Sequence, residues 1–391
     1  MTSPGSNVPA RSSFLVFGQP LIGEEEKREI LDSLDKAWLG TGPKVARFER
    51  DFAAYKNVAA GAALNSCTAA LHLSCVALNL APGDEVITTP MTFCATANAI
   101  LHAGGRPVLA DVDPDSMNLD PAAAERAITP RTRALLVVHF AGRPCDMDAF
   151  LSIAERRGLA VIEDCAHAIE TEYKGRKAGT LGDFGCFSFY STKNVVTGEG
   201  GMVLARRPAD LDRIRVLGLH GMSKDAWKRF SDEGFKHYDV VAAGFKYNMM
   251  DLQAAIGIHQ LARVETWWRR RREIWMRYSE AFQGLGLGLP APDAPETRHA
   301  YHLYTVLVDR ERVGIDRDTF LERMTRQNIG VGVHYRSLPE HPYYQQALGW
   351  RPADFPHAFT IGRQTVSLPL SPKLTDEDVA DVVRAVRTVL A

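Results

Sequence analysis

From residue 86 onward, short apolar runs alternate with amphipathic stretches along the chain. We predict strands at Val86–Thr88, Pro107–Ala110, Ala134–Phe140, Leu159–Ile162, Cys186–Tyr190 and Gly201–Ala205, and helices at Phe93–His102, Pro121–Ile128 and Met147–Arg157. Near-continuous apolar strands separated by helices are typical of a mostly parallel sheet that is covered by helices on both faces. The pattern therefore predicts a large α/β domain that extends to about Leu261.

A second, smaller unit is predicted after a break in the helical pattern. The stretch Asp251–Phe282 predicts one long helix, and the segment Gly284–Pro295 that follows is rich in glycine and proline, which terminate helices. Beyond it we predict a small α+β domain with a strand at His302–Val308, a helix at Asp316–Gln327, a strand at Gly330–His334 and a helix from Thr375. The expected division is a flexible N-terminus (1–13), a large domain (14–261), and a connecting helix with a small C-terminal domain (262–391).

The composition is that of a globular protein and excludes several classes of partner. Of the 391 residues, 46% are hydrophobic and 24% are charged, and the formal net charge is -1. Such a balance leaves no bulk positive charge to attract nucleic acid or an anionic membrane. No apolar run approaches the roughly 18 residues that a membrane span needs. The six cysteines form no C-x-x-C pair and lie mostly in apolar stretches, which favours reduced thiols and a cytoplasmic location.

Two groups of reactive side chains follow predicted strands. Asp164 and His167 come just after the strand that ends at Ile162, and Lys193 follows the apolar strand Cys186–Tyr190. Ligands of parallel α/β sheets bind at the carboxyl ends of the strands. A lysine that is buried there has a lowered pKa and a nucleophilic amine, although an isolated lysine more often extends to solvent. An isolated aspartate at such a place is more often a helix cap, so neither residue alone identifies a site.

Two further segments offer groups for a phosphate and an aromatic ring. The segment Ser66–Thr68 opens an apolar helix, whose first amides can bind an anion, while an ordinary helix cap explains the same residues. Phe93 lies just beyond a strand and is either a stacking surface or a core residue. Taken with Lys193 and Asp164, these segments describe a site for pyridoxal phosphate. That cofactor needs an amine, a carboxylate beside its ring nitrogen and anchors for its phosphate.

Segments spread over nearly the whole chain are similar to motifs of one known family. They are Trp38–Pro43, Asn65–Leu71, Thr92–Phe93, Glu163–Ala168, Phe187–Lys193, Gly198–Gly201 and Gly244–Ala255. In these motifs the chain resembles the DegT/DnrJ/StrS family of sugar aminotransferases, which depend on pyridoxal phosphate. The resemblance implies the fold-type I architecture of aspartate aminotransferase, with a large, mostly parallel α/β domain and a small α+β C-terminal domain.

The resemblance also implies a role for each site residue. Lys193 would bind the cofactor covalently, Asp164 would pair with its ring nitrogen, and His167 would lie near its ring hydroxyl. Phe93 would cover the ring, and His334 and Tyr335 would border the substrate pocket. The phosphate would be held by Ser66, Cys67, Thr68 and Ser188 and, across a homodimer interface, by Asn248 with Lys246 as the rival residue.

The expected activity is transfer of an amino group from an amino acid, glutamate by the resemblance, to a nucleotide-linked keto sugar at C4. Pyridoxamine phosphate would be the intermediate form of the cofactor. Amination at C3 and a non-catalytic regulator that binds pyridoxal phosphate are the alternatives. Lys193 argues against the dehydratases of this family, which have histidine at that position. A nicotinamide-dependent oxidoreductase would need a glycine fingerprint after its first strand, and the sequence has none there.

Overall fold

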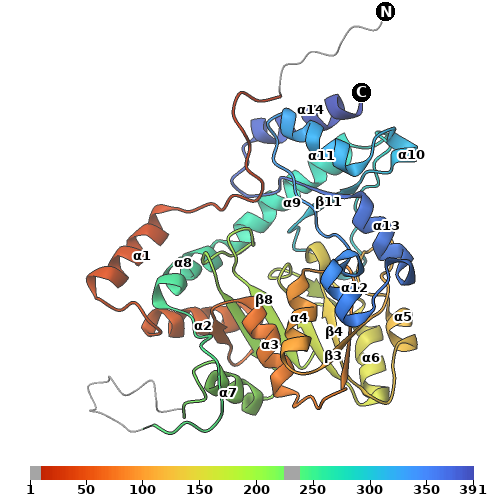
Figure 1. Cartoon of the computed structure of the whole chain (residues 1–391). Helices are drawn as coiled ribbons and strands as arrows, with labels where there is room; N and C mark the ends of the chain where they lie inside the picture. Colours follow the sequence, from red (N-terminus) through yellow and green to blue (C-terminus); the bar gives the residue numbers. More distant parts are fainter. Residues whose placement is uncertain (1–9, 224–237) are drawn as a thin grey trace, which may run out of the picture.

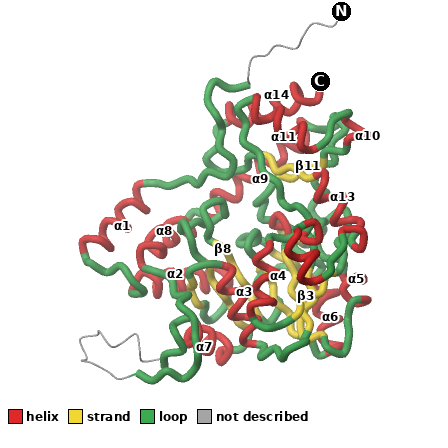
Figure 2. The backbone as a smooth tube through the Cα atoms, in the orientation of Figure 1, coloured by secondary structure: helices red, strands yellow, loops and turns green. Residues whose placement is uncertain are grey.

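The computed structural model describes residues 10–223 and 238–391 of the chain. Helices surround a central sheet in the larger part of the molecule, and the C-terminal segments form a smaller unit beside it (Figure 1). Figure 2 shows the strands of the sheet gathered in the larger part, with β11 apart from them in the smaller one. None of the described helices is long and apolar enough to cross a membrane.

A seven-stranded sheet forms the centre of the large domain, in the order β1-β9-β8-β5-β4-β2-β3. Its strands are β1 (Ala62–Leu64), β2 (Glu85–Thr88), β3 (Arg106–Leu109), β4 (Thr132–Val138), β5 (Ala160–Asp164), β8 (Phe184–Ser188) and β9 (Gly201–Ala205). Strand β9 is antiparallel to β1 and β8, and the other neighbouring strands are parallel. This confirms the predicted fold class. It also brings the carboxyl ends of β1, β2, β5 and β8 to the same edge of the sheet.

Successive residues of each strand face opposite sides of the sheet, as the two-residue period of a strand requires. In β4, Leu136 and Val138 pack into the core beneath α3, α4 and α7, whereas Leu135 and Val137 pack into the core beneath α5 and α6. Each fully buried side chain of this kind contributes roughly 1.5–3 kcal/mol of hydrophobic free energy. The covering helices are α3 (Cys67–Ala77), α4 (Cys94–His102) and α7 (Pro208–Leu217) on one face, and α2 (Pro43–Lys56), α5 (Pro121–Arg126), α6 (Met147–Arg157) and α8 (Asp251–Ala262) on the other.

The smaller unit has its own apolar core beneath a two-stranded antiparallel sheet. Its main elements are α9 (Val264–Ala281), β11 (Tyr304–Leu307), α11 (Arg317–Arg326), β12 (Thr365–Leu368) and α14 (Asp376–Leu390). Thr375 caps α14 by accepting the amide of Asp378, which agrees with the predicted start of that helix.

The remaining helices and strands of the chain are α1 (Glu24–Asp35), β6 (Glu172–Tyr173), β7 (Arg176–Lys177), β10 (Thr297–Arg298), α10 (Arg310–Val313), α12 (Pro342–Leu348) and α13 (Pro356–Gln364).

The helix predicted over Asp251–Phe282 is wrong as a single element. It is divided into α8 and α9 at Arg263, whose backbone has φ -106° and ψ 0°. No glycine or proline marks this break in the sequence. The side chain of Arg263 pairs with Glu25 and Glu26 of α1, so a tertiary contact accompanies the change of direction that carries α9 to the small domain.

The strand predicted at Gly330–His334 is also wrong. Only Gly332 of this segment pairs with the small sheet, through two hydrogen bonds to the backbone of Ser367. The partner of β11 is instead β12, which ends at Leu368 just before a proline and was missed in the sequence. The segment 330–334 leaves the sheet because the carbonyl and the ring of His334 bond to side chains of β12, not to its backbone.

The N-terminal segment lies against the small domain. Residues 1–9 of the segment that we expected to be flexible lie outside the described residues. Arg11 makes ion pairs with Asp378 and Asp381 of α14, and Leu15 pairs with Ile329.

Candidate active site

The residues expected to act on the cofactor lie along one edge of the sheet. Asp164 is the last residue of β5, Ser188 is the last residue of β8, and Ser66 lies just beyond β1. Lys193 lies in the turn after β8, where its backbone amide donates to the carbonyl of Tyr190 (2.8 Å). Parallel strands direct their carboxyl ends to the same edge, and this topology gathers segments that are far apart in the sequence.

The amine of Lys193 has a lowered pKa. Burial disfavours its charged form and lowers its pKa to about 8, although the nearby Cys67 and Asp164 act in the opposite direction. An amine with such a pKa is about half neutral near pH 8, whereas an ordinary lysine is almost fully protonated there. The neutral amine can attack a carbonyl carbon or accept a proton.

Asp164 is fixed in place by two hydrogen bonds. One carboxylate oxygen accepts from the hydroxyl of Thr96 (2.9 Å), and the other accepts from the amide of Ala166 (3.1 Å). Burial raises the pKa of Asp164, and these donors together with the charge of Lys193 offset only part of the rise. A cation held beside this carboxylate would therefore favour its charged form strongly. Thr96 was missed in the sequence, where its only signal is its position one helical turn after Thr92.

His167 is held as a neutral imidazole between two partners. Its Nδ1 accepts from the amide of Ala141 (3.2 Å), and its Nε2 lies 3.0 Å from the hydroxyl of Tyr335. Burial and the charges of neighbouring groups, first among them Lys193, hold the pKa of His167 well below its usual range. The single ring proton therefore lies on Nε2, which donates to Tyr335. The hydroxyl proton of Tyr335 is thus free to bond to a ligand.

Two aromatic or imidazole side chains complete the wall of the site. Phe93 is 58% exposed, and its ring centre lies 6.2 Å from that of Tyr335, so Phe93 is not a core residue. The ring centre of His334 lies 5.1 Å from that of Tyr335. Nδ1 of His334 is 2.8 Å from the hydroxyl of Ser367 in β12. Burial, assisted by the charge of Lys193, lowers the pKa of His334 to about 4. The small domain therefore presents neutral polar groups to Lys193.

The start of α3 has the features of an anion site. The hydroxyl of Ser66 caps the helix by accepting the amide of Ala69 (3.0 Å), and the amides of Cys67 and Thr68 have no partner within the helix. A Cβ atom on Gly201 would lie 2.4 Å from the carbonyl of Ser66, so only glycine allows β9 to approach this turn. Burial keeps the pKa of the Cys67 thiol well above its usual value, so this thiol adds no charge that would repel a phosphate.

Ser188 and Asn248, the other two expected phosphate ligands, lie near the same turn. Ser188 is buried, and its hydroxyl accepts the amide of Tyr190 (3.4 Å). Asn248 pairs with Leu64 of its own chain, and its side chain donates to the hydroxyl of Thr41 (2.7 Å).

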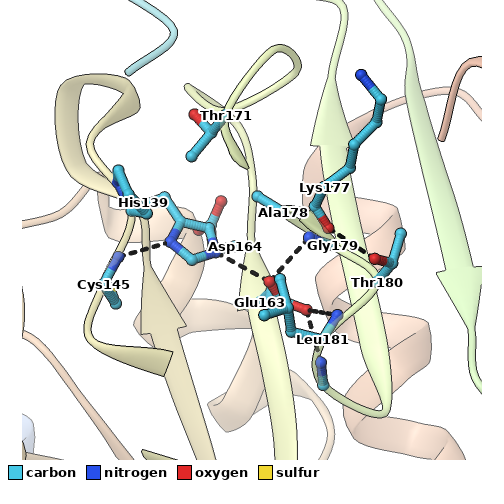
Figure 3. A network of polar contacts seen from close by, with 12 residues as sticks. His139, Cys145, Glu163, Asp164, Thr171, Lys177, Ala178, Gly179, Thr180 and Leu181 are labelled. Atoms are coloured by element: carbon cyan, nitrogen blue, oxygen red, sulfur yellow. Dashed lines mark hydrogen bonds and ion pairs between the residues drawn. The ribbon is translucent and has the colours of Figure 1, made fainter. Parts of the chain in front are cut away.

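Glu163 anchors the strand that carries Asp164, as Figure 3 shows. Its carboxylate accepts the amides of Gly179, Leu181 and Gly182 at 2.7–2.8 Å and lies 3.0 Å from Nε2 of His139. Burial alone would raise the pKa of Glu163, but the hydrogen bonds from His139 and the amides hold it below its usual range. The group His139, Glu163 and Cys165 could reach one metal ion, yet both oxygens of Glu163 already accept N–H groups. This cluster therefore serves to position the end of β5.

The donor set fits pyridoxal phosphate. It combines a partly neutral lysine, a buried carboxylate, an exposed aromatic ring and the open amides of a helix start. Together with the sheet topology, these groups define a pyridoxal-phosphate-dependent aminotransferase of fold type I. Residues 20–387 match the DegT/DnrJ/EryC1/StrS aminotransferase family, and the chain belongs to that family of sugar aminotransferases.

Individual relatives agree with this assignment. The spore coat polysaccharide biosynthesis protein SpsC of Bacillus subtilis is 49% identical over 385 residues, which cover 98% of this chain and 99% of SpsC. The PLP-form of Spr1654 from Streptococcus pneumoniae is 31% identical, with a TM-score of 0.89 over 96% of this chain and 98% of that one, and a PMP-form is also solved. DesI in the presence of its TDP-sugar product is 32% identical, with a TM-score of 0.84 over 97% of this chain and 93% of that one.

Proposed function

We propose that the protein transfers an amino group from glutamate to C4 of a nucleotide-linked 4-keto sugar. The observation that carries this proposal is that Lys193 interacts electrostatically both with Asp164 of the large domain and with His334 of the small domain. A site bordered by both domains offers one wall for the cofactor and another for the substrates. The nucleotide-sugar class is supported by DesI, whose structure was solved with its TDP-sugar product. We place the reaction in the cytoplasm, because all six cysteines are free thiols.

Each residue of the site has its own role in transamination. Pyridoxal phosphate supplies an electron sink that stabilises negative charge on the carbon next to the transferred nitrogen. Asp164 would hold the ring nitrogen of the bound cofactor in its protonated form. Lys193 would take a proton from the α-carbon of the amino donor and return it on the other side of the transferred nitrogen, a double role that suits a pKa of about 8. The hydroxyl of Tyr335 and the imidazole of His334 orient the sugar.

The carbon that is aminated tests the proposal most directly. Only a carbonyl held within about 3 to 3.5 Å of the amine can react, so the pocket and not the diphosphate decides the position. Enzyme in the pyridoxamine form, mixed with nucleotide-linked 4-keto and 3-keto sugars, should recover the absorbance of the pyridoxal form faster with the 4-keto sugar. Faster reaction of the 3-keto isomer would contradict C4 amination and leave the aminotransferase assignment in place. If neither sugar nor any amino acid reacts with loaded enzyme, the regulator alternative is favoured.

We also infer a homodimer in which each active site uses residues of both chains. Helix α1 packs on α8 at the edge of the molecule (Figure 1) and, with the turn after it, exposes large apolar side chains. These are Leu31, Leu34, Trp38 and Leu39, which are between 46% and 57% exposed. A second copy of the chain is the partner that would cover such a surface.

Mixed dimers test whether Asn248 acts across the interface. Purified heterodimers of one Lys193→Ala chain and one Asn248→Ala chain should have about one working site in two, because a twofold interface places both defects in the same site. The measurement is the single-turnover amplitude, with each chain carrying a different affinity tag. If Asn248 serves its own chain, beside Leu64 and Thr41, both sites are defective and no activity returns. Lys246→Ala is the matched control, because Lys246 is the rival of Asn248 for the phosphate contact across the interface.

A further inference from the structure

The turn that follows β4 carries the backbone amide that bonds to His167. Within this turn, which comprises residues 139–144, the amide of Ala141 donates to Nδ1 of His167 (3.2 Å). The backbone of Ala141 has φ 56° and ψ 3°, a left-handed conformation that favours glycine. A residue other than glycine persists in this conformation where the surrounding structure fixes it. The partners of the turn therefore decide where the N–H group of Ala141 points.

The side chain of Asn118 holds one side of the turn with all of its polar atoms. Its amide oxygen accepts the N–H group of Phe140 (2.9 Å), and its amide nitrogen donates to the carbonyls of Arg143 (3.2 Å) and Pro144 (3.0 Å). Asn118 lies between β3 and α5 and is buried, with 4% of the residue exposed. Its amide cannot be turned around, because its NH₂ group would then face a donor and its oxygen would face two acceptors. Asn118 thus clamps the chain on both sides of Ala141.

The carbonyl groups of the turn are held from the opposite side. The carbonyl of Ala141 accepts the amides of His302 (3.1 Å) and Leu303 (3.3 Å), which lie just before β11 of the small domain. The carbonyl of Gly142 accepts the hydroxyl of Thr171 (2.7 Å) from the large domain. Partners from both domains therefore fix the backbone of Ala141 in its left-handed conformation.

The direction of the Ala141 amide decides which nitrogen of His167 is protonated. A nitrogen that accepts an N–H group carries no proton, so the ring proton of His167 lies on Nε2, 3.0 Å from the hydroxyl of Tyr335. In this tautomer Nε2 donates to the oxygen of Tyr335 and leaves the hydroxyl proton for a ligand. In the other tautomer Nε2 would accept that proton, and Tyr335 would offer no donor to the site.

We propose that Asn118 is a positioning residue of the active site, which fixes the tautomer of His167 through the turn at Ala141 and thereby makes Tyr335 a hydrogen-bond donor toward the sugar. The inference rests on the proposed function in one respect, the role of Tyr335 in orienting the sugar. All three hydrogen bonds of the Asn118 side chain go to the turn, so Asn118 acts through the backbone.

The tautomer of His167 is measurable in the cofactor-free protein. With ¹⁵N-labelled histidine, the nitrogen chemical shifts should show a proton on Nε2 and none on Nδ1, the signals being assigned by their loss in His167→Gln. Asn118→Leu removes all three contacts with little change in side-chain volume and should turn the single tautomer into a mixture. A proton on Nδ1 in the wild type, or one unchanged tautomer in the variant, would overturn the proposal.

Two further variants separate this role from a general loss of stability. Asn118→Asp keeps the oxygen that accepts from Phe140 and loses both donors, so it should also give a mixture and replaces Asn118→Leu if that variant does not fold. If neither variant folds, Asn118 serves stability and the proposal is lost.

Asn98→Leu is the matched control for the tautomer measurement. The amide oxygen of Asn98 accepts the hydroxyl of Tyr344 (2.8 Å), so this substitution breaks a side-chain contact between α4 and α12, away from the turn. The melting temperature should fall and the tautomer of His167 should stay as in the wild type. A mixture of tautomers in Asn98→Leu would show that any destabilisation is sufficient, which contradicts a specific role of Asn118.

Half-reaction kinetics connect the tautomer to catalysis. In Asn118→Leu, the second-order rate constant of the pyridoxamine form with the keto sugar should fall roughly threefold to tenfold, which corresponds to the loss of one hydrogen bond. The reaction with glutamate should change much less, and equal losses in both half-reactions would contradict the role of Tyr335. If no sugar is aminated and the tautomer responds as expected, the proposed function is wrong and the clamp stands. If sugars are aminated and the tautomer does not respond, the clamp is wrong and the function stands.

Discussion

Replacement of Lys193 by alanine is expected to reduce transamination by about 10²- to 10⁴-fold through the loss of proton transfer alone, and by more through the loss of the covalent link to the cofactor. Cofactor should still bind, because Asp164 and the start of α3 are unchanged. The rate of conversion of the bound cofactor by glutamate, followed by absorbance, measures the loss. Borohydride reduction of the wild-type protein should fix the cofactor to the peptide that contains Lys193.

Lys56 offers a matched control for this experiment. Burial lowers its pKa to about 8, as for Lys193, although nearby charges differ. Its amine, however, donates to the carbonyls of Ile169 (2.7 Å) and Ala178 (2.9 Å) and lies 4.3 Å from the ring centre of Phe187. We therefore expect no cofactor on Lys56. A label on Lys56, or on Lys174 or Lys246, would contradict the assignment.

Substitution of Asp164 by asparagine is the second change with a large expected effect. Asparagine keeps the shape and removes the charge that holds the ring nitrogen protonated, so turnover should fall by at least about 10²-fold. Cofactor affinity should fall much less, since the phosphate site is separate. The two quantities are measured by single-turnover kinetics and by titration of the cofactor-free protein. Near-normal turnover with cofactor bound would refute the role of Asp164.

Thr96 provides a graded control for Asp164. Thr96→Val removes the hydroxyl that donates to the carboxylate, and Thr96→Ser retains it. Thr96→Val should raise the pKa of Asp164 further and lower turnover moderately, while Thr96→Ser should behave nearly as the wild type. A loss in Thr96→Ser with none in Thr96→Val, which retains a methyl group at this place, would instead indicate that packing of the threonine methyl group is responsible.

Six of the seven strands of the central sheet, all except β1, could be predicted because a strand that is buried in such a sheet is apolar on both faces. The apolar run that precedes Asp164 and the one that precedes Lys193 each form a strand of the sheet, and the two strands are neighbours. Because Asp164 and Lys193 follow these runs in the sequence, both residues could be placed near the end of a strand. Local chemistry was sufficient for these elements.

Elements that depend on distant partners could not be predicted in the same way. The break at Arg263 has no glycine or proline, and its ion pairs reach back to α1 across more than half of the chain. The short strand β12 is recognisable only through its partner β11. Thr96, which bonds to Asp164, looks like any small helical residue until the fold brings α4 to the end of β5.

The sequence by itself determined the α/β class, the strand ends and the residue types at those ends, because apolar periodicity and turn chemistry act over a few residues. Only the tertiary structure decided the ionisation of Lys193 and the neutral state of His167. These properties depend on desolvation and on hydrogen-bond partners from segments that meet only in the folded chain. The identity of the reactive groups is therefore local information, whereas their protonation and orientation are produced by the fold.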